Sequence, residues 1–146
     1  MEDISGLGIS VTIFASKTFP AGLTVSQFAD DADPLDLPDI EILSEGMNVN
    51  GELVTWLTPK PLIVDLNLLP ETEDSKNLDI LFDANRPAYK KVTVRDVITL
   101  VVNYPDGKKK VLNNGRPKAY AVSPSIASAG RYKSRRYQFV FENKIN

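Results

Sequence analysis

Five aspartates in one short stretch are the first side chains of this sequence that could do chemistry, and that chemistry would be cation binding. They are Asp30, Asp31, Asp33, Asp36 and Asp39. Carboxylates on a flexible loop are preferred ligands of Ca²⁺. Their spacing is not that of an EF-hand, however, and Pro34 limits how the chain can wrap an ion. We therefore interpret residues 29–39 as a solvated or partner-facing acidic loop and predict no metal-ligating residue.

Groups that could catalyse a reaction are scarce. The chain has no histidine and no cysteine, which excludes imidazole mechanisms, thiol nucleophiles and disulfides. The acidic residues between 71 and 83 fit the first turn and the exposed face of a helix. No Ser-x-x-Lys pair opens a helix, and no glycine-rich phosphate loop is present. We predict no catalytic residue, no cofactor and no enzymatic activity.

Charge is distributed unevenly along the chain. Residues 1–85 carry 16 acidic and 3 basic side chains, whereas residues 86–146 carry 3 acidic and 14 basic ones, for a net charge of −2. If the two halves present different faces, complementary patches favour head-to-tail self-association. The alternative is that strands from both halves interleave and mix the charges over the surface.

The basic residues near the C-terminus could bind an anion. Arg131, Lys133 and Arg135 alternate along one predicted strand beside Tyr132 and Tyr137, a pattern also typical of surfaces that bind single-stranded nucleic acid. Because the whole chain is acidic, with a pI near 5.2, we favour contact with acidic loops of a neighbouring subunit. The predicted interface combines a lysine run, the last strand and the acidic loop: Lys108, Lys109, Lys110, Arg131, Lys133, Arg135, Arg136, Asp30, Asp31, Asp33, Asp36 and Asp39.

Short strands must position these side chains. The β-branched run 97–104, the turn Pro105-Asp106-Gly107 and the segment 108–112 predict a β-hairpin with one buried arm. Thr72 is a suitable N-cap for one helix that ends before Pro87. Further strands are predicted at 7–15, 23–28, 40–43, 52–57, 61–69, 119–122 and 131–143.

These elements predict a mainly β protein, residues 1–146 forming a single domain. We expect two packed antiparallel sheets, a sandwich or barrel, with one flanking α-helix at about 73–85. No run of about 18 apolar residues predicts a membrane span.

Four blocks of the sequence carry a family pattern, and they begin at Gln27-Phe28-Ala29-Asp30, Glu73-Asp74-Ser75-Lys76, Arg95-Asp96-Val97-Ile98 and Ser128-Ala129-Gly130-Arg131. These blocks resemble small structural proteins of contractile-tailed bacteriophages, which are often named tail or tail-fibre proteins. The layout also looks like the tail-tube fold. The resemblance implies a virion structural protein, a hexameric ring in the tail tube or where the tube meets the baseplate, and assembly in the host bacterial cytoplasm.

The same resemblance implies the partners. These would be further copies of the chain and other tube, sheath or baseplate proteins, with DNA passing through a channel but no specific nucleic-acid binding. The residues by themselves leave one alternative open, a monomeric β-barrel module that binds carbohydrate or single-stranded nucleic acid.

Overall fold

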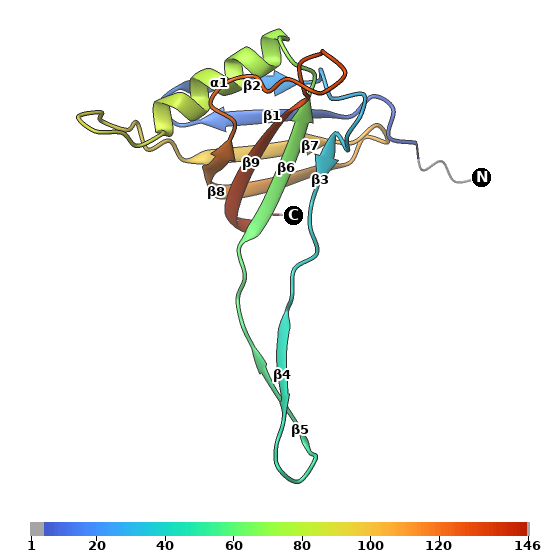
Figure 1. Cartoon of the computed structure of the whole chain (residues 1–146). Helices are drawn as coiled ribbons and strands as arrows, with labels where there is room; N and C mark the ends of the chain where they lie inside the picture. Colours follow the sequence, from blue (N-terminus) through green and yellow to red (C-terminus); the bar gives the residue numbers. More distant parts are fainter. Residues whose placement is uncertain (1–4, 146) are drawn as a thin grey trace.

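The computed structural model describes residues 5–145 and shows a curled antiparallel sheet, one helix and a projecting two-stranded ribbon (Figure 1). The elements follow in the order β1 (Ser10–Ala15), β2 (Phe19–Val25), β3 (Leu35–Asp36), β4 (Leu43–Met47), β5 (Leu53–Leu57), β6 (Leu62–Leu68), α1 (Glu73–Asn85), β7 (Ile98–Asn103), β8 (Lys109–Tyr120) and β9 (Arg135–Lys144).

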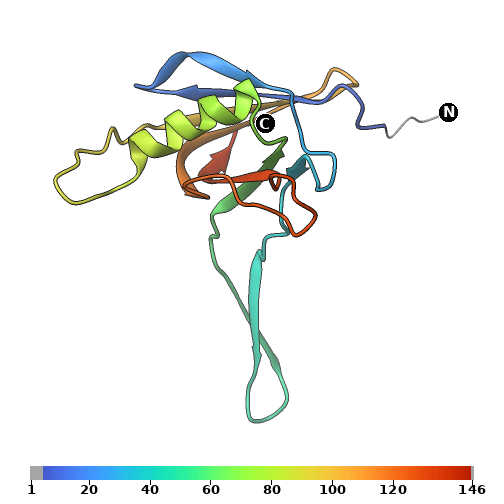
Figure 2. The ribbon, with the colours of Figure 1, turned by 45° about the horizontal axis from the view of Figure 1, so that its top comes forward.

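Seven strands form the main sheet in the order β2-β1-β7-β8-β9-β6-β3, and all neighbours are antiparallel. The sheet curls, so that one of its faces encloses the hydrophobic core while α1 lies across it (Figures 1 and 2). The mainly β class with one flanking helix is thereby confirmed. The core lies inside the curl of one sheet, and the second sheet is the small β4–β5 ribbon.

The predicted central hairpin is confirmed as β7 and β8. Ile98, Leu100 and Val102 are buried and alternate with partly covered residues, as expected for a strand with both faces at least partly covered. Gly107 closes the turn at φ +92°, a backbone conformation that glycine adopts without steric cost. The segments 108–112 and 119–122, expected as separate strands, belong to one long β8 that passes an irregularity near Asn114, where φ is +52°.

Helix α1 has the predicted bounds. The Thr72 hydroxyl accepts a hydrogen bond from the backbone N–H of Ser75 at 3.3 Å, which caps the first turn. Leu78, Leu81 and Phe82 follow at helical spacing and are buried against the sheet. The Phe82 ring packs among aromatic rings of β8 and β9, and its centroid is 5.0 Å from that of Phe139.

Arg135, a residue of the predicted interface, lies at the start of β9 and is buried. Tyr137, Phe139 and Phe141 are buried as expected, but the Arg135 side chain is also only 3% exposed. An arginine can lie there because an ion pair with α1 compensates its charge.

The β4–β5 ribbon leaves the sheet and extends well beyond it (Figures 1 and 2). Its strands pair from Leu43 opposite Leu57 to Met47 opposite Leu53. The Asn48 carboxamide oxygen organises the turn by accepting the backbone N–H groups of Asn50 and Glu52, at 3.0 and 2.9 Å. Strands are present near the predicted ranges 40–43, 52–57 and 61–69, but they do not form one meander, because β4 and β5 pair only with each other and β6 pairs with β9 and β3.

Candidate functional site

The ribbon exposes more apolar side chains than a free surface normally carries. Trp56 is 52% exposed, although a tryptophan side chain contributes most to the stability of a core or an interface when its ring is buried. The other exposed apolar residues of the ribbon are Ile42, Leu43, Met47, Val49, Leu53, Val54 and Leu57. Contiguous apolar surface of this kind marks an interaction site. Three glutamates, Glu41, Glu45 and Glu52, lie among these side chains, whereas residues 40–57 contain no Lys or Arg.

An apolar groove of about 270 Å³ lies at the base of the ribbon. The chain from Leu37 to Ile40 forms one wall, and Leu62, Val102 and Tyr104 contribute to the floor. Lys110 and Lys144 also line the groove, so it combines apolar walls with two cationic side chains. The predicted interface residue Lys110 therefore lies beside the ribbon.

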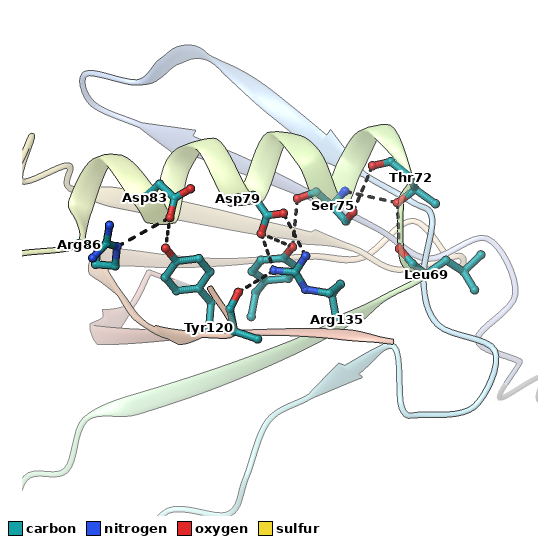
Figure 3. Close-up of polar contacts among 10 residues, drawn as sticks. Leu69, Thr72, Ser75, Asp79, Asp83, Arg86, Tyr120 and Arg135 are labelled. Carbon is teal, nitrogen blue, oxygen red and sulfur yellow. Dashed lines mark hydrogen bonds and ion pairs between the residues drawn. The ribbon is translucent and has the colours of Figure 1, made fainter. Parts of the chain in front are cut away.

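Arg135 joins β9 to α1 through a buried polar cluster (Figure 3). Its guanidinium donates two hydrogen bonds to the Asp79 carboxylate, at 3.0 and 2.7 Å, and a third to the carbonyl oxygen of Ala121 at 2.7 Å. The Tyr137 hydroxyl lies 2.8 Å from Asp79 Oδ1 and 3.0 Å from the Ser75 carbonyl oxygen. Burial, and then the hydrogen bond to Asp79, raise the pKa of Tyr137 far above its usual value, so the phenol keeps its proton. Arg135 therefore stabilises the fold within the chain.

A second polar contact holds the C-terminal turn of α1. The Tyr120 hydroxyl donates a hydrogen bond to Asp83, which also forms an ion pair with Arg86 at 3.9 Å (Figure 3). Burial and the neighbouring Asp83 carboxylate raise the pKa of Tyr120. The helix is thus anchored to β8 at this end and to β9 near its middle.

The acidic loop meets the basic end of the chain within the same molecule. Arg131 forms an ion pair with Asp30 at 3.4 Å, and the Ser134 hydroxyl donates a hydrogen bond to Asp31. Asp36 lies in β3, and Asp39 lines a shallow hollow beside Lys60. The five aspartates remain on the surface, where their role in an interface stays a prediction.

The other predicted basic residues occupy different places. Lys108 forms an ion pair with Asp106 at 3.6 Å in the β7–β8 turn, and Lys109 begins β8. Lys133 lies in the loop before β9, where its backbone N–H bonds the Ser125 carbonyl oxygen at 2.7 Å. Arg136 forms an ion pair with Asp65 at 2.8 Å. The twelve predicted residues are therefore spread over the β7–β8 turn, the ribbon base, the acidic loop, the start of β9 and the loop before it.

The charges of the two sequence halves mix in the fold. Ion pairs join Asp30, Asp65, Asp79 and Asp83 of the first half to arginines of the second half. These contacts form because strands from the two halves interleave in the sheet, which is the alternative to two separate faces of opposite charge.

Neither a metal centre nor a membrane span emerges from the geometry. Within residues 5–145, no three acidic side chains come close enough together to hold a metal ion. The helix in this part of the chain is too short and too polar to cross a bilayer.

Sequence reasoning missed the ribbon as a functional element. The signal was present in residues 53–57, where Leu53, Val54, Trp56 and Leu57 leave Thr55 as the only polar residue. Such a run is equally typical of an ordinary strand of a packed sheet. The sequence also gives no sign that Asp65 and Asp79 are the ion-pair partners of Arg136 and Arg135.

Comparison with known proteins gives a family model and several structures. Residues 2–145 match the model of a family described as tail fiber protein gp32. No curated protein sequence matches the chain.

Three solved structures share the fold. The anti-feeding prophage baseplate, 6-fold symmetrised, gives a TM-score of 0.55 at 10% identity over 99% of this chain and 94% of that chain. The tube-terminating cap of the anti-feeding prophage gives a TM-score of 0.53 at 10% identity, over 99% of this chain and 90% of that chain. The PVC sheath/tube terminator, part of an extracellular contractile injection system, gives a TM-score of 0.52 at 12% identity, over 99% of this chain and 96% of that chain. At these identities the likeness establishes the fold.

Proposed function

The chain belongs to the tail fiber protein gp32 family, and from this premise we propose that it forms a hexameric ring in a phage contractile tail, in the tube or at the tube–baseplate junction. Membership confirms the resemblance to phage tail proteins, and a structural role in the tail follows from it. The proteins that share its fold are described as parts of a baseplate, a tube-terminating cap and a sheath/tube terminator. The 6-fold symmetry of that baseplate supports six copies.

The observation that carries this proposal is the exposed apolar ribbon. An isolated two-stranded hairpin has marginal stability in water, and three or more strands or a packing partner are needed to stabilise it. The ribbon instead exposes Trp56, Leu57 and Leu53 to solvent, outside the core of its own chain. Neighbouring subunits of a ring or of a stacked ring would cover these side chains.

The two edges of the main sheet also favour closure into a ring. Edge strand β2 has one bonded neighbour in the described sheet, β1. At the opposite edge, β3 and the chain from Gln27 to Ala29 pair with the second half of β6 and leave its first half, from Leu62 to Val64, without a partner on that side within the described residues. Unpaired strand edges are templates for pairing with another chain. A closed ring satisfies both edges, because each subunit has a neighbour on either side.

The chain has a non-enzymatic role in this proposal. Its partners are further copies of itself and other tube, sheath or baseplate proteins. Its location is the tail of the virion, after assembly in the host bacterial cytoplasm, and any DNA in the channel passes without specific binding.

Removal of the apolar side chains at the ribbon tests the proposal. In Trp56→Ser/Leu57→Ser, both changed residues are exposed in the monomer, so the fold should survive and assembly should fail. Loss of one buried interface tryptophan alone costs about 2 kcal/mol or more, which is roughly a 30-fold loss of affinity. Val122→Ser, at another exposed apolar residue, is the matched control.

Light scattering and negative-stain microscopy report the result. Rings or stacked tubes from the wild type and from Val122→Ser, with monomers from the ribbon variant, are the expected outcome. A wild type that stays monomeric at high concentration and binds an oligosaccharide or a single-stranded oligonucleotide would contradict the ring and favour a binding module.

A further inference from the structure

An acidic pocket lies at the β3–β6 edge of the sheet, apart from the ribbon. Asp33, Asp36 and Asp65 line this hollow of about 390 Å³ together with Asn67 and Arg136. Asp36 of β3 is the register partner of Asp65 of β6, so two carboxylates face each other directly across the strand pair. Like charges in this position destabilise a sheet unless a cation lies between or beside them.

The pocket has too few cations of its own. Arg136 donates a hydrogen bond to Asp65 Oδ2 at 2.8 Å, but in the part of the chain that the structure describes no donor reaches Asp65 Oδ1. Asp65 is only 4% exposed, and an unsatisfied buried acceptor is costly. Within the same residues, no hydrogen bond or ion pair engages the Asp33 or Asp36 carboxylate. One guanidinium therefore faces three carboxylates.

A basic side chain suits this pocket better than a metal ion does. The acidic residues described in the structure are not arranged to hold a metal ion, which requires several ligands at close range. A lysine ammonium or an arginine guanidinium needs only one or two carboxylate oxygens, and a guanidinium offers the donors that pair with them.

The loop between α1 and β7 carries such side chains. Residues 86–95 contain Arg86, Lys90, Lys91 and Arg95 and no acidic residue. Arg86 and Lys91 are engaged with Asp83. Lys90 lies over the exposed Tyr89 ring, with its Nζ 5.4 Å from the ring centroid, and both Lys90 and Arg95 are exposed.

The base of this loop is held firmly. The buried Asp96 carboxylate accepts hydrogen bonds from the backbone N–H groups of Lys17 and Thr18, at 2.7 and 3.0 Å, and from the Asn85 carboxamide at 2.9 Å. The Asn85 carboxamide oxygen in turn accepts the Asp96 N–H at 2.8 Å. A loop fixed at its base loses less conformational entropy when it binds.

The loop and the pocket lie on opposite sides of the molecule. In Figures 1 and 2 the loop projects beyond one end of α1, whereas β3 lies toward the other end. Because α1 has 13 residues, it separates these regions by about 20 Å. A contact between two different surfaces of identical chains generates a ring when the rotation closes.

We propose that the acidic pocket receives Lys90 or Arg95 from the α1–β7 loop of a second copy of this chain. This contact deepens the proposed function, on which it rests, because it assigns the two faces that meet between neighbouring subunits. Each copy gives a basic side chain to one neighbour and accepts one from the other. Tyr89 and Val92, exposed on the same loop, add apolar contact at the rim.

A charge exchange between two variants tests the contact. Asp33→Lys/Asp36→Lys replaces two carboxylates of the pocket with ammonium groups, and Lys90→Glu/Arg95→Glu replaces the two loop cations that would enter the pocket with carboxylates. Each variant alone places like charges at every interface, so half-assembly should need at least a tenfold higher concentration, about the effect expected for a close charge pair. When the two variants are mixed, opposite charges meet at every contact, and rings that alternate the two variants should form.

Lys76→Glu/Lys118→Glu is the matched control, because it makes the same change in net charge as the loop variant at exposed positions of α1 and β8. Analytical ultracentrifugation and negative-stain microscopy measure assembly, and circular dichroism checks that each variant is folded. At the concentration that half-assembles the wild type, rings are expected from the wild type, from the control and from the mixture, but not from either variant alone. Rings from the loop variant alone overturn this contact and leave the ring intact, whereas a wild type that never associates overturns both.

Discussion

Replacement of Arg135 by alanine should destabilise the monomer, because this residue forms the most buried ion pair of the described chain. Arg135→Ala removes two hydrogen bonds to Asp79 and one to the Ala121 carbonyl oxygen, and it leaves Asp79 with Tyr137 as its partner. Breaking a buried ion pair by removing one partner costs about 3–5 kcal/mol. The Asp79 side chain is 28% exposed, and water therefore compensates part of its charge. We expect a loss of about 3 kcal/mol in the free energy of unfolding.

Urea denaturation and a thermal melt measure this change. The midpoint of urea denaturation should fall with little change in the dependence of the unfolding free energy on urea concentration. The melting temperature should fall by about 10 °C, since a change of about 3 °C per kcal/mol is typical for a chain of this size. Arg131→Ala is the control, because its ion pair with Asp30 is exposed and is worth less than about 1 kcal/mol.

The double variant Arg135→Met/Asp79→Leu should recover part of the lost stability, since both charges leave together. If Arg135→Ala is no less stable than Arg131→Ala, the reasoning is refuted, and Arg135 is better explained as a residue that serves assembly.

Two further predictions concern the interior. Burial alone would raise the pKa of Asp96, but hydrogen bonds from Thr18, Asn85 and the Lys17 backbone lower this pKa below the usual aspartate value. The Asp96 carboxylate therefore stabilises the fold at any pH above the normal aspartate pKa. This contribution to stability is lost as the pH falls through the lowered pKa. Asp96→Asn should therefore cost about 2 kcal/mol at neutral pH and flatten the acid limb of a stability-versus-pH curve; an unchanged acid limb would contradict this role. Gly115→Ala should cost about 1–3 kcal/mol in urea denaturation, because the added Cβ would lie 2.2 Å from a ring carbon of Phe141, whereas Gly6→Ala, with nothing within 4 Å, should be neutral.

Local signals in the sequence were sufficient for much of the fold. The run 97–104 and its Pro-Asp-Gly turn predicted β7 and the start of β8, because β-branched residues and a turn with glycine determine a hairpin locally. Thr72 and Pro87 marked the helix correctly for a similar reason, since capping depends on residues three or four positions apart.

The sequence could not place the elements whose environment is set by distant partners. The apolar run 53–57 fits a strand that packs on the core of its own chain and a strand that packs on another chain equally well. The hydrophobic pattern indicates that the strand is buried, but it does not indicate which chain buries it. The burial of Arg135 was unpredictable for the same reason, because it depends on a partner that is distant in the sequence. Its type suggested an exposed interface, and only the position of Asp79 on α1 makes the buried site tolerable.

The candidate site was therefore only partly predictable. The charge contrast between the two halves of the sequence suggested contacts between copies, but the pocket depends on the register that places Asp36 opposite Asp65. The basic residues of the α1–β7 loop were not selected, since they form no regular pattern and their projection from the body is visible only in the fold.

The ribbon also has a kinetic consequence. A two-stranded ribbon that packs on no core keeps many conformations in the free subunit. In the proposed ring, the first two copies that meet must order their ribbons before other contacts compensate the lost conformational entropy. A copy that joins a ring already formed would find its binding surface in place, so growth would be faster than nucleation, and another tail component that supplied a first layer would speed assembly.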